Sequence, residues 1–274
     1  MAGRLTVCPT PIGNLEDLSP RARRALGDAD LVACEDTRRA GLLYERLEIR
    51  RPRFVSYHDA NESDRAWQLA QQIERGARVV LISDAGTPVL SDPGYRVVRT
   101  CIERGLELEV LPGPSAITTA LVASGLPAAR WRFEGFLPRR GGELERVLSS
   151  RDTVVAFESP RRLPESLAAL GGLAPDRPAA VCRELTKLHE EVARGTLGEL
   201  ARRFRDEARG EIVVVIGPAA TATAGADIGF AVDALRRLVQ SGARPRAAAG
   251  VVAALTGTRA NDLYRGLTGR DPRQ

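Results

Sequence analysis

An apolar run and an amphipathic run are joined by Ile82-Ser83-Asp84-Ala85-Gly86-Thr87-Pro88-Val89-Leu90-Ser91-Asp92-Pro93-Gly94. The run before it, 78–82, is short and rich in β-branched residues, which is typical of a buried strand. The run after it, 95–104, has the spacing of an amphipathic helix. Two glycines, two prolines, two serines and two aspartates in the connection leave backbone N–H groups free and allow another molecule to approach closely. Ligands in α/β sheets bind beyond the carboxyl ends of strands, so this loop is the first predicted ligand site.

The end of this loop also has the features of a helix start. Ser91 or Asp92 can cap the helix that follows, with Pro93 at its first position. A capping role does not account for residues 84–88, which come earlier. The ligand contact is therefore predicted for the first half of the loop.

Strands and helices alternate along the first part of the chain. Apolar runs predict strands at 5–8, 31–34, 54–57, 78–82 and 108–111. A first helix is predicted to begin at Pro20, after a cap at Ser19. A second follows residues 35–38 and ends near Leu47. A third runs from a cap at Ser63 to Arg75, and a fourth covers 95–104. This alternation predicts βαβ units and a mainly parallel sheet. Polar residues that follow the strands should gather at one edge of that sheet: Thr10, Glu35, Asp36, His58, Asn61, Asp84 and Thr87.

The pattern changes at Pro112-Gly113-Pro114-Ser115, which predicts a domain boundary near Gly113. After a helix over 115–124, strands are predicted at 131–137, 153–157, 179–182 and 212–216, with helices at 142–149, 161–170 and 196–205. Segment 219–226 has the composition of a linker, and helical runs at 228–240, 245–255 and 259–267 outline a helix-turn-helix-like bundle. The predicted fold is α/β, with domains over 1–113 and 114–218 and a basic helical domain over 227–274.

Composition narrows the class of protein. The 274 residues suffice for two domains, and 43% apolar with 27% charged residues is ordinary for a soluble protein. No apolar run reaches the ~18 residues of a membrane span, and the first residues lack a signal-peptide pattern, so a cytoplasmic protein is expected. Cys8, Cys34, Cys101 and Cys182 are widely separated, which predicts buried free thiols rather than disulfides or a zinc site.

Positive charge is concentrated near the end of the sequence. The whole chain has a net charge of +5. Residues 227–274 contain eight arginines and four aspartates, a balance of +4, which leaves +1 for the rest. Such a segment suggests an anionic partner, with RNA as the leading candidate, although a solvated helical tail would have the same composition.

Eight motifs occur in a characteristic order. They are residues 10–15 (TPIGNL), 34–38 (CEDTR), 57–62 (YHDANE), 83–94 (SDAGTPVLSDPG), 111–116 (LPGPSA), 134–138 (EGFLP), 157–161 (FESPR) and 183–187 (RELTK). In this order they resemble the tetrapyrrole methylase superfamily, and within it the enzymes that methylate the ribose 2′-oxygen of a cytidine in 16S rRNA. The resemblance implies two α/β domains with a cleft for S-adenosyl-L-methionine between them. It also implies a homodimer acting on 16S rRNA within the small ribosomal subunit.

The resemblance assigns cofactor contacts by position. The implied residues are Pro11, Asp84, Ala85, Gly86, Thr87, Pro88 and Leu90 near the methionine end, Ser115 and Ala116 beside the inter-domain connection, and Glu158, Leu185 and Ile212 on the adenosine side. The usual aspartate of the superfamily loop is replaced by Thr87, so either Thr87 or Asp84 makes the polar contact. The sequence has no Gly-x-Gly-x-x-Gly after its first strand, which disfavours a Rossmann-type site.

Methyl transfer to a ribose hydroxyl requires alignment of the reacting atoms and benefits from a general base. Glu35 is the first candidate because it matches an acidic position of superfamily relatives, and His58 is the second because histidine titrates near neutrality. Asp36 and Glu184 are further candidates, although Asp36 can equally be a helix cap and His58 a hydrogen-bonded loop residue. The arginines expected to hold RNA phosphates are Arg38, Arg161, Arg244, Arg246 and Arg259. No residue spacing indicates a metal site.

Two other functions fit parts of the sequence. A methyltransferase of the same fold could act on tetrapyrroles, but the basic tail and the variant motifs at 34–38 and 57–61 argue against it. A non-catalytic RNA-binding assembly factor is a third possibility, against which the intact cleft motifs argue.

Overall fold

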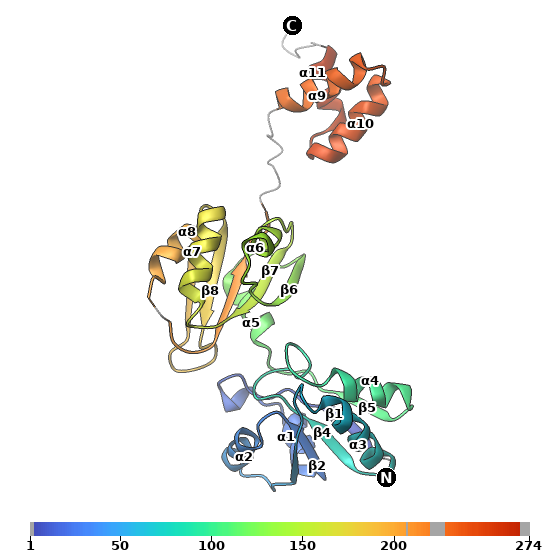
Figure 1. The fold of residues 1–274 in the computed structure, drawn as a ribbon, viewed down its shortest axis with the longest axis vertical. Helices are drawn as coiled ribbons and strands as arrows, with labels where there is room; N and C mark the ends of the chain where they lie inside the picture. The colour runs from blue at the N-terminus through green and yellow to red at the C-terminus, as the bar shows by residue number, and fades with distance from the viewer. Residues whose placement is uncertain (1–2, 207, 220–227, 269–274) are drawn as a thin grey trace. The chain divides into compact units, whose positions relative to one another are not determined.

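The computed structural model describes residues 3–206, 208–219 and 228–268. The chain divides into two units, one of residues 1–147 and 153–217 and the other of residues 148–152 and 218–274. The first unit contains two five-stranded sheets, and the second contains a three-helix bundle (Figure 1). The described helices are all too short or too polar to cross a membrane.

The first sheet is parallel throughout, as the alternation of strands and helices predicts. Its strands are β1 (Arg4–Val7), β2 (Leu31–Cys34), β3 (Arg53–Ser56), β4 (Arg78–Leu81) and β5 (Glu107–Val110), in the order β3-β2-β4-β1-β5. Between them lie the 3-10 helix η1 (Leu15–Asp17) and helices α1 (Pro20–Asp28), α2 (Thr37–Arg46), α3 (Glu62–Glu74) and α4 (Tyr95–Glu103). In this order, the loops that follow β2, β4 and β1 are neighbours at one edge of the sheet.

Helices cover both faces of this sheet. Leu5 and Val7 of β1 pack with α3 and α4, whereas Cys8, just after the strand, packs with α1 and α2. Successive residues of a strand point to opposite faces, so both faces must be apolar. This explains why β2 and β4 are almost continuous apolar runs. The four cysteines are free and buried, as predicted.

The second sheet is mixed. Its strands are β6 (Trp131–Phe136), β7 (Thr153–Glu158), β8 (Pro178–Arg183), β9 (Glu191–Thr196) and β10 (Ile212–Ile216), in the order β6-β7-β10-β8-β9. Only β6 and β7 pair in parallel. Helix α5 (Ala116–Ser124) packs on one face, α6 (Gly141–Leu148) follows β6, and α7 (Leu163–Leu173) packs with α8 (Leu197–Arg203). Sequence patterns did not predict β9, because an edge strand needs little apolar surface and this one contains Glu191 and Arg194.

Helix α4 does not begin as the sequence suggests. Its N-cap is Gly94, with φ of 147°, and neither Ser91 nor Asp92 caps it. The side chain of Glu62 on α3 instead accepts hydrogen bonds from the backbone N–H groups of Gly94 and Arg96, each at 3.0 Å, and from the Tyr57 hydroxyl at 3.1 Å. Glu62 is the first residue of α3, whose N-cap is Asn61 rather than Ser63. Residues of the 57–62 motif thus fix the end of the 83–94 loop, which leaves Asp92 without a capping role.

The second unit contains the helices α9 (Ile228–Gln240), α10 (Pro245–Thr256) and α11 (Ala260–Thr268), close to the predicted bounds. Ala231, Leu235, Val252 and Leu263 form its small core. Gly257, with φ of 70°, ends α10 in the left-handed conformation that favours glycine. Apart from Ala219, the predicted linker lies outside the described residues.

We expect Glu62→Ala to lower the free energy of unfolding by about 2 kcal/mol, because two backbone donors and a buried hydroxyl lose their acceptor. Burial alone would raise the pKa of Glu62, but the backbone hydrogen bonds from Arg96 and Gly94 outweigh it and the pKa is lowered. The contribution of Glu62 should therefore be lost only as pH falls through this depressed value. Urea denaturation at several pH values measures both effects.

The matched control is Glu103→Ala on the exposed face of α4, where Glu103 pairs with Arg99. Its effect should stay within about 0.5 kcal/mol. Equal effects of the two substitutions would show that Glu62 does not hold the start of α4.

Candidate active site

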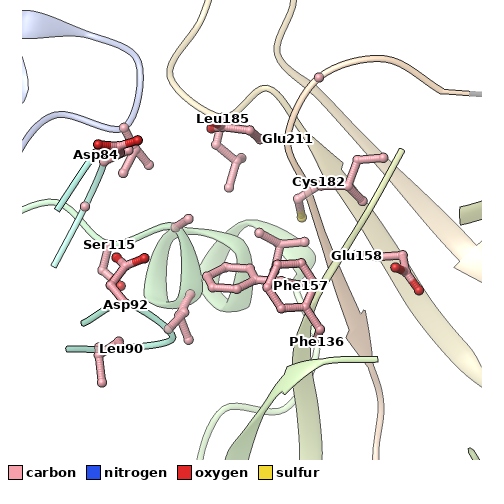
Figure 2. Close-up of a pocket in the computed structure, with 18 of the residues that line it drawn as sticks. Asp84, Leu90, Asp92, Ser115, Phe136, Phe157, Glu158, Cys182, Leu185 and Glu211 are labelled. Atoms are coloured by element: carbon pink, nitrogen blue, oxygen red, sulfur yellow. The ribbon is translucent and has the colours of Figure 1, made fainter. Parts of the chain in front are cut away.

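A cavity of about 420 Å³ lies in the first unit, within the size range of small-molecule sites. One side is formed by the loops that follow β2 and β4. The other is formed by residues of β6, β7 and β10 and the turn after β8, with the start of α5 between them. Figure 2 shows Asp84 and Asp92 on the first side and Phe136 and Phe157 on the second. We call the first the acidic side and the second the apolar side, because apolar residues predominate on the second although Glu158 and Glu211 also line it.

The 84–87 part of the loop is held by backbone hydrogen bonds. The N–H of Thr10 donates to Gly86 O at 2.9 Å, and the N–H of Gly86 donates to Thr10 O at 3.0 Å. A side chain at Gly86, with φ of 77°, would be strained and would crowd Ile12. The hydroxyl of Thr87 donates to Pro114 O at 3.0 Å, which ties this loop to the connection between the two sheets.

These hydrogen bonds help to decide whether Thr87 or Asp84 is the better candidate for the polar contact with the cofactor. The single hydroxyl proton of Thr87 is already used by Pro114. Asp84 accepts the N–H of Asp36 at 3.3 Å and pairs with Arg39 at 3.2 Å, and it lines the cavity. The geometry therefore favours Asp84 for the polar contact.

Carboxylates close to one another perturb the acidity of the site. Burial raises the pKa of Asp92 to about 6, and the charges of Glu35, Asp84 and Asp59 add to the increase. The pKa of Glu35 is also raised, first by burial of its carboxyl and then by Asp84 and Asp59. The negative charge of Glu35 is one of the causes that raise the pKa of Asp92. A carboxyl that titrates near pH 6 suits general-base chemistry.

The apolar side is rigidly packed. The ring of Phe157 meets those of Phe133 and Phe136 edge to face, with centroids 5.1 and 5.7 Å apart. Glu158, at the end of β7, is buried and satisfied within the protein. It accepts from Ser159 N at 2.7 Å and from the Ser166 hydroxyl at 2.5 Å, and Arg162 lies 3.3 Å away. Glu158 therefore stabilises this wall although it also lines the cavity.

Most residues assigned to the cofactor by resemblance are brought together here. The lining residues among them are Asp84, Ala85, Gly86, Thr87, Leu90, Ser115, Ala116, Glu158, Leu185 and Ile212. Pro11 and Pro88 do not line the cavity, although their neighbours Ile12 and Thr87 do.

Of the four candidate bases, Glu35 lines the cavity, whereas Asp36, His58 and Glu184 do not. Asp36 caps α2 and accepts from the N–H of Arg38 at 2.8 Å. The side-chain hydrogen bond from Arg38 lowers the pKa of Asp36, which weakens it as a base. The helix-cap alternative is thus the arrangement that the structure contains.

His58 is held by the side chain of Asn61. Asn61 Oδ1 accepts from the His58 backbone N–H at 3.0 Å, so its Nδ2 is directed to Ser56 O and His58 Nε2, at 3.2 and 3.1 Å. Because Nδ2 is a donor, His58 Nε2 must be an acceptor, and a neutral ring carries its proton on Nδ1. The acceptor nitrogen of His58 is therefore occupied within its own loop.

Glu184 is similarly engaged. Its carboxylate accepts from Lys187 Nζ at 2.7 Å and from the N–H of Glu211 at 2.9 Å. The hydrogen bond from Lys187 is the largest cause of its lowered pKa. Glu184 has a φ of 52°, and its side chain leaves no space for a Cβ at Gly210. It positions the 210–211 segment, which lines the cavity.

The arginines expected to bind RNA are exposed, two of them on the first unit and three on the second. Arg38 pairs with Asp36 at 3.1 Å and keeps 90% of its side chain exposed, and Arg161 is exposed after β7. Arg244, Arg246 and Arg259 are exposed on the helical unit, at the starts of α10 and α11. In the part of the chain that the structure describes, no three His, Cys, Asp or Glu residues are grouped so as to hold a metal ion.

The family model of the tetrapyrrole (corrin/porphyrin) methylases matches residues 4–201. The chain belongs to this methylase family. It is 48% identical over 270 residues to ribosomal RNA small subunit methyltransferase I of Mycobacterium tuberculosis, covering 96% of this chain and 94% of that protein. The protein of the same name from Thermotoga maritima is 41% identical and covered to 98%, yet it matches only 78% of this chain.

The fold implied by the resemblance is confirmed. A crystal structure of uroporphyrin-III C-methyl transferase from Thermus thermophilus, complexed with S-adenyl homocysteine, superposes with a TM-score of 0.56 at 21% identity. The superposed region covers 78% of this chain and 97% of the Thermus thermophilus chain. The two α/β sheets with their helices are therefore of the methylase type, and the C-terminal helices are present as well.

In this methylase-family chain, sequence patterns did not assign several of the lining residues to the site, among them Arg39, Asp92, Phe136, Phe157 and Glu211. Asp92 belongs to the 83–94 loop but was interpreted as a possible helix cap. Phe136 and Phe157 lie in quoted motifs, yet an aromatic residue in a strand is usually a core residue. The repeated acid in the 83–94 loop was the signal that could have identified Asp92.

We expect Asp92→Asn to stabilise the protein above pH 6. The folded-state pKa of about 6 exceeds the ordinary 3.8, so ionisation opposes folding. The loss of folding free energy caused by ionisation of Asp92 is absent below about pH 4, increases up to about pH 6 and is constant above it. A two-unit shift corresponds to at most ~3 kcal/mol, and solvent screening leaves about 1–2 kcal/mol.

Thermal or urea unfolding at pH 4 and pH 8 measures this difference. Asp64→Asn, on the exposed surface of α3, is the control and should change little at either pH. Destabilisation by Asp92→Asn at pH 8 would contradict the raised pKa of Asp92.

Proposed function

We propose that this chain transfers a methyl group from S-adenosyl-L-methionine to the ribose 2′-oxygen of a cytidine in 16S rRNA of the small ribosomal subunit. The observation that carries the proposal is one cavity with acidic and apolar sides, where Asp92 has a pKa of about 6. The name shared by relatives up to 48% identical over 96% of the chain supports rRNA as the substrate. The alternatives are a tetrapyrrole substrate and a non-catalytic role.

The residues of the cavity fit the cofactor. The carboxylates of Asp84 and Glu35 complement its positive charges, and the apolar residues Leu185 and Val213 offer a surface for its adenine ring. Gly86 allows close approach at the tightest part of the loop. When bound, the cofactor supplies an electrophilic methyl group on a sulfonium. The chain must hold the attacking hydroxyl in line and exclude water.

Asp92 takes the proton of the attacking ribose hydroxyl. The bound cofactor would supply the methyl carbon, and its carbon–sulfur bond would break, with the electron pair left on sulfur, as the ribose oxygen bonds to that carbon. The hydroxyl proton passes to the Asp92 carboxylate, whose proton affinity is increased by burial and by the charge of Glu35. Glu35, the first sequence-based candidate, acts here by setting that affinity. It takes the catalytic role itself only if Asp92 proves dispensable.

The helical unit supplies affinity for RNA rather than chemistry. Arg244, Arg246 and Arg259 are exposed there and can neutralise phosphates. The Thermotoga maritima relative is covered almost completely by 78% of this chain, so about a fifth of this chain has no counterpart in it. Binding by added basic residues is compatible with such a difference in length, whereas an essential catalytic part is not.

The pH dependence of methyl transfer distinguishes Asp92 from Glu35. The rate should rise with pH through about 6, as Asp92 ionises. Asp92→Asn should reduce kcat by about 10²- to 10⁴-fold. Glu35→Gln should retain activity and move the acid limb to lower pH, because a neighbouring negative charge is removed. Loss of activity in Glu35→Gln with full activity in Asp92→Asn would return the role to Glu35.

Substrate choice is tested by transfer of a radiolabelled methyl group to unmethylated small ribosomal subunits and to a tetrapyrrole precursor. We expect labelling of 16S rRNA at a cytidine 2′-oxygen, which protects the adjacent phosphodiester from alkali, and none of the tetrapyrrole. The triple variant Arg244→Gln, Arg246→Gln and Arg259→Gln should raise KM and reduce its salt dependence, with kcat unchanged. Transfer only to the tetrapyrrole, or to neither, would exclude the proposal.

A further inference from the structure

Two apolar side chains that line the cavity are also largely exposed. Phe136 is 57% exposed and Leu90 is 45% exposed. A side chain can line the cavity and also be exposed to solvent only where the cavity opens to the surface. Leu90 comes from the loop after β4 and Phe136 from the end of β6, so the opening has an apolar residue on each side.

The two segments that carry these residues approach each other. A Cβ built on Gly135 would lie 3.8 Å from the Ser91 hydroxyl oxygen. Gly135 and Ser91 are the immediate neighbours of Phe136 and Leu90 in sequence. The two exposed side chains therefore belong to adjoining parts of the opening.

Both segments have an irregular backbone. Val89 and Ser91, on either side of Leu90, have φ of 78° and 65°, which is costly for a β-branched residue such as Val89. On the other side, the register of β6 with β7 shifts between Phe133 and Phe136, and Gly135 has φ of 75°. A bulge of this kind redirects a side chain, and such strain persists mainly at functional sites.

The ring of Phe136 has a firm support. It packs edge to face on Phe157, which in turn packs on Phe133. A ring supported on one side and exposed on the other can stack on a flat molecule with little loss of conformational entropy. Asp92, the proton acceptor, is two residues from Leu90 in the same loop. The opening thus offers an apolar slot close to the acid.

Given the proposed function, on which this inference rests, we propose that Leu90 and Phe136 form a clamp that holds the nucleobase of the target nucleotide, with Phe136 as the stacking surface. A nucleotide turned out of its strand presents a flat base and, one bond away, a ribose. The slot accepts the base and the acidic side accepts the ribose hydroxyl. Single-stranded RNA is commonly recognised by bases stacked on aromatic side chains.

The test compares Phe136→Leu with Phe136→Tyr in the full chain. Leucine keeps the apolar packing but removes the flat surface, whereas tyrosine keeps both. With small ribosomal subunits as substrate, Phe136→Leu should raise KM by about 10-fold or more, within the range measured for base stacking. Phe136→Tyr should stay within about two-fold of the wild type, and S-adenosylhomocysteine affinity by calorimetry should be unchanged in both variants. Tyr95→Leu, an exposed aromatic residue of α4 outside the cavity, is the control and should leave KM unchanged.

Each other outcome overturns the clamp. An unchanged KM in Phe136→Leu would show that no base rests on the ring. A parallel loss of S-adenosylhomocysteine affinity would assign the ring to the cofactor adenine. Methylation of a tetrapyrrole that depends on Phe136, with rRNA kinetics unaffected, would assign the slot to a macrocycle. Failure of the wild type to methylate rRNA is a separate result that removes the proposed function itself.

Discussion

The two hydrogen bonds between the backbones of Thr10 and Gly86 join the loops of neighbouring strands β1 and β4. They keep the β4 loop at the edge of the first sheet, where the Thr87 hydroxyl reaches Pro114 on the connection to the second sheet. Because Asp84 and Asp92 belong to this loop, its position decides where the negative charge of the cavity lies. A flexible loop would let these carboxylates move apart, and the shared electrostatic field would weaken.

That field is maintained at a cost to the fold. Glu35, Asp84 and Asp92 are like charges, and Arg39 offsets only part of their repulsion by pairing with Asp84. The surrounding structure is correspondingly firm: Glu62 fixes the end of the loop, and Glu158 with Arg162 fixes the facing wall. Glu62 and Glu158, which stabilise the scaffold, each accept from several protein donors, whereas burial and neighbouring carboxylates raise the pKa of Asp92 to about 6.

Local sequence patterns were sufficient where local forces decide the structure. Alternating apolar and amphipathic runs predicted the parallel sheet, and the turn-rich loop after β4, predicted to contact a ligand, lines a cavity. The patterns failed where a distant partner decides. Glu62 replaces a local cap at the start of α4, and pairing with β8 makes a strand of the charged segment Glu191–Thr196. The raised pKa of Asp92 depends on its burial in the folded protein and on the charge of Glu35, which is far away in sequence, and no local pattern contains either cause.

Lys187, the only lysine of the sequence, lies between the carboxylates of Glu184 and Glu211, at 2.7 and 3.1 Å. Burial would lower its pKa, but the hydrogen bonds to these carboxylates raise it. Since Glu211 lines the cavity, a ligand that displaces this carboxylate would also loosen its hold on the ammonium group. Amine-directed reagents, for which the other target is the α-amino group, would then react faster at Lys187. The arginine-rich composition thus provides a single chemical reporter beside the cavity.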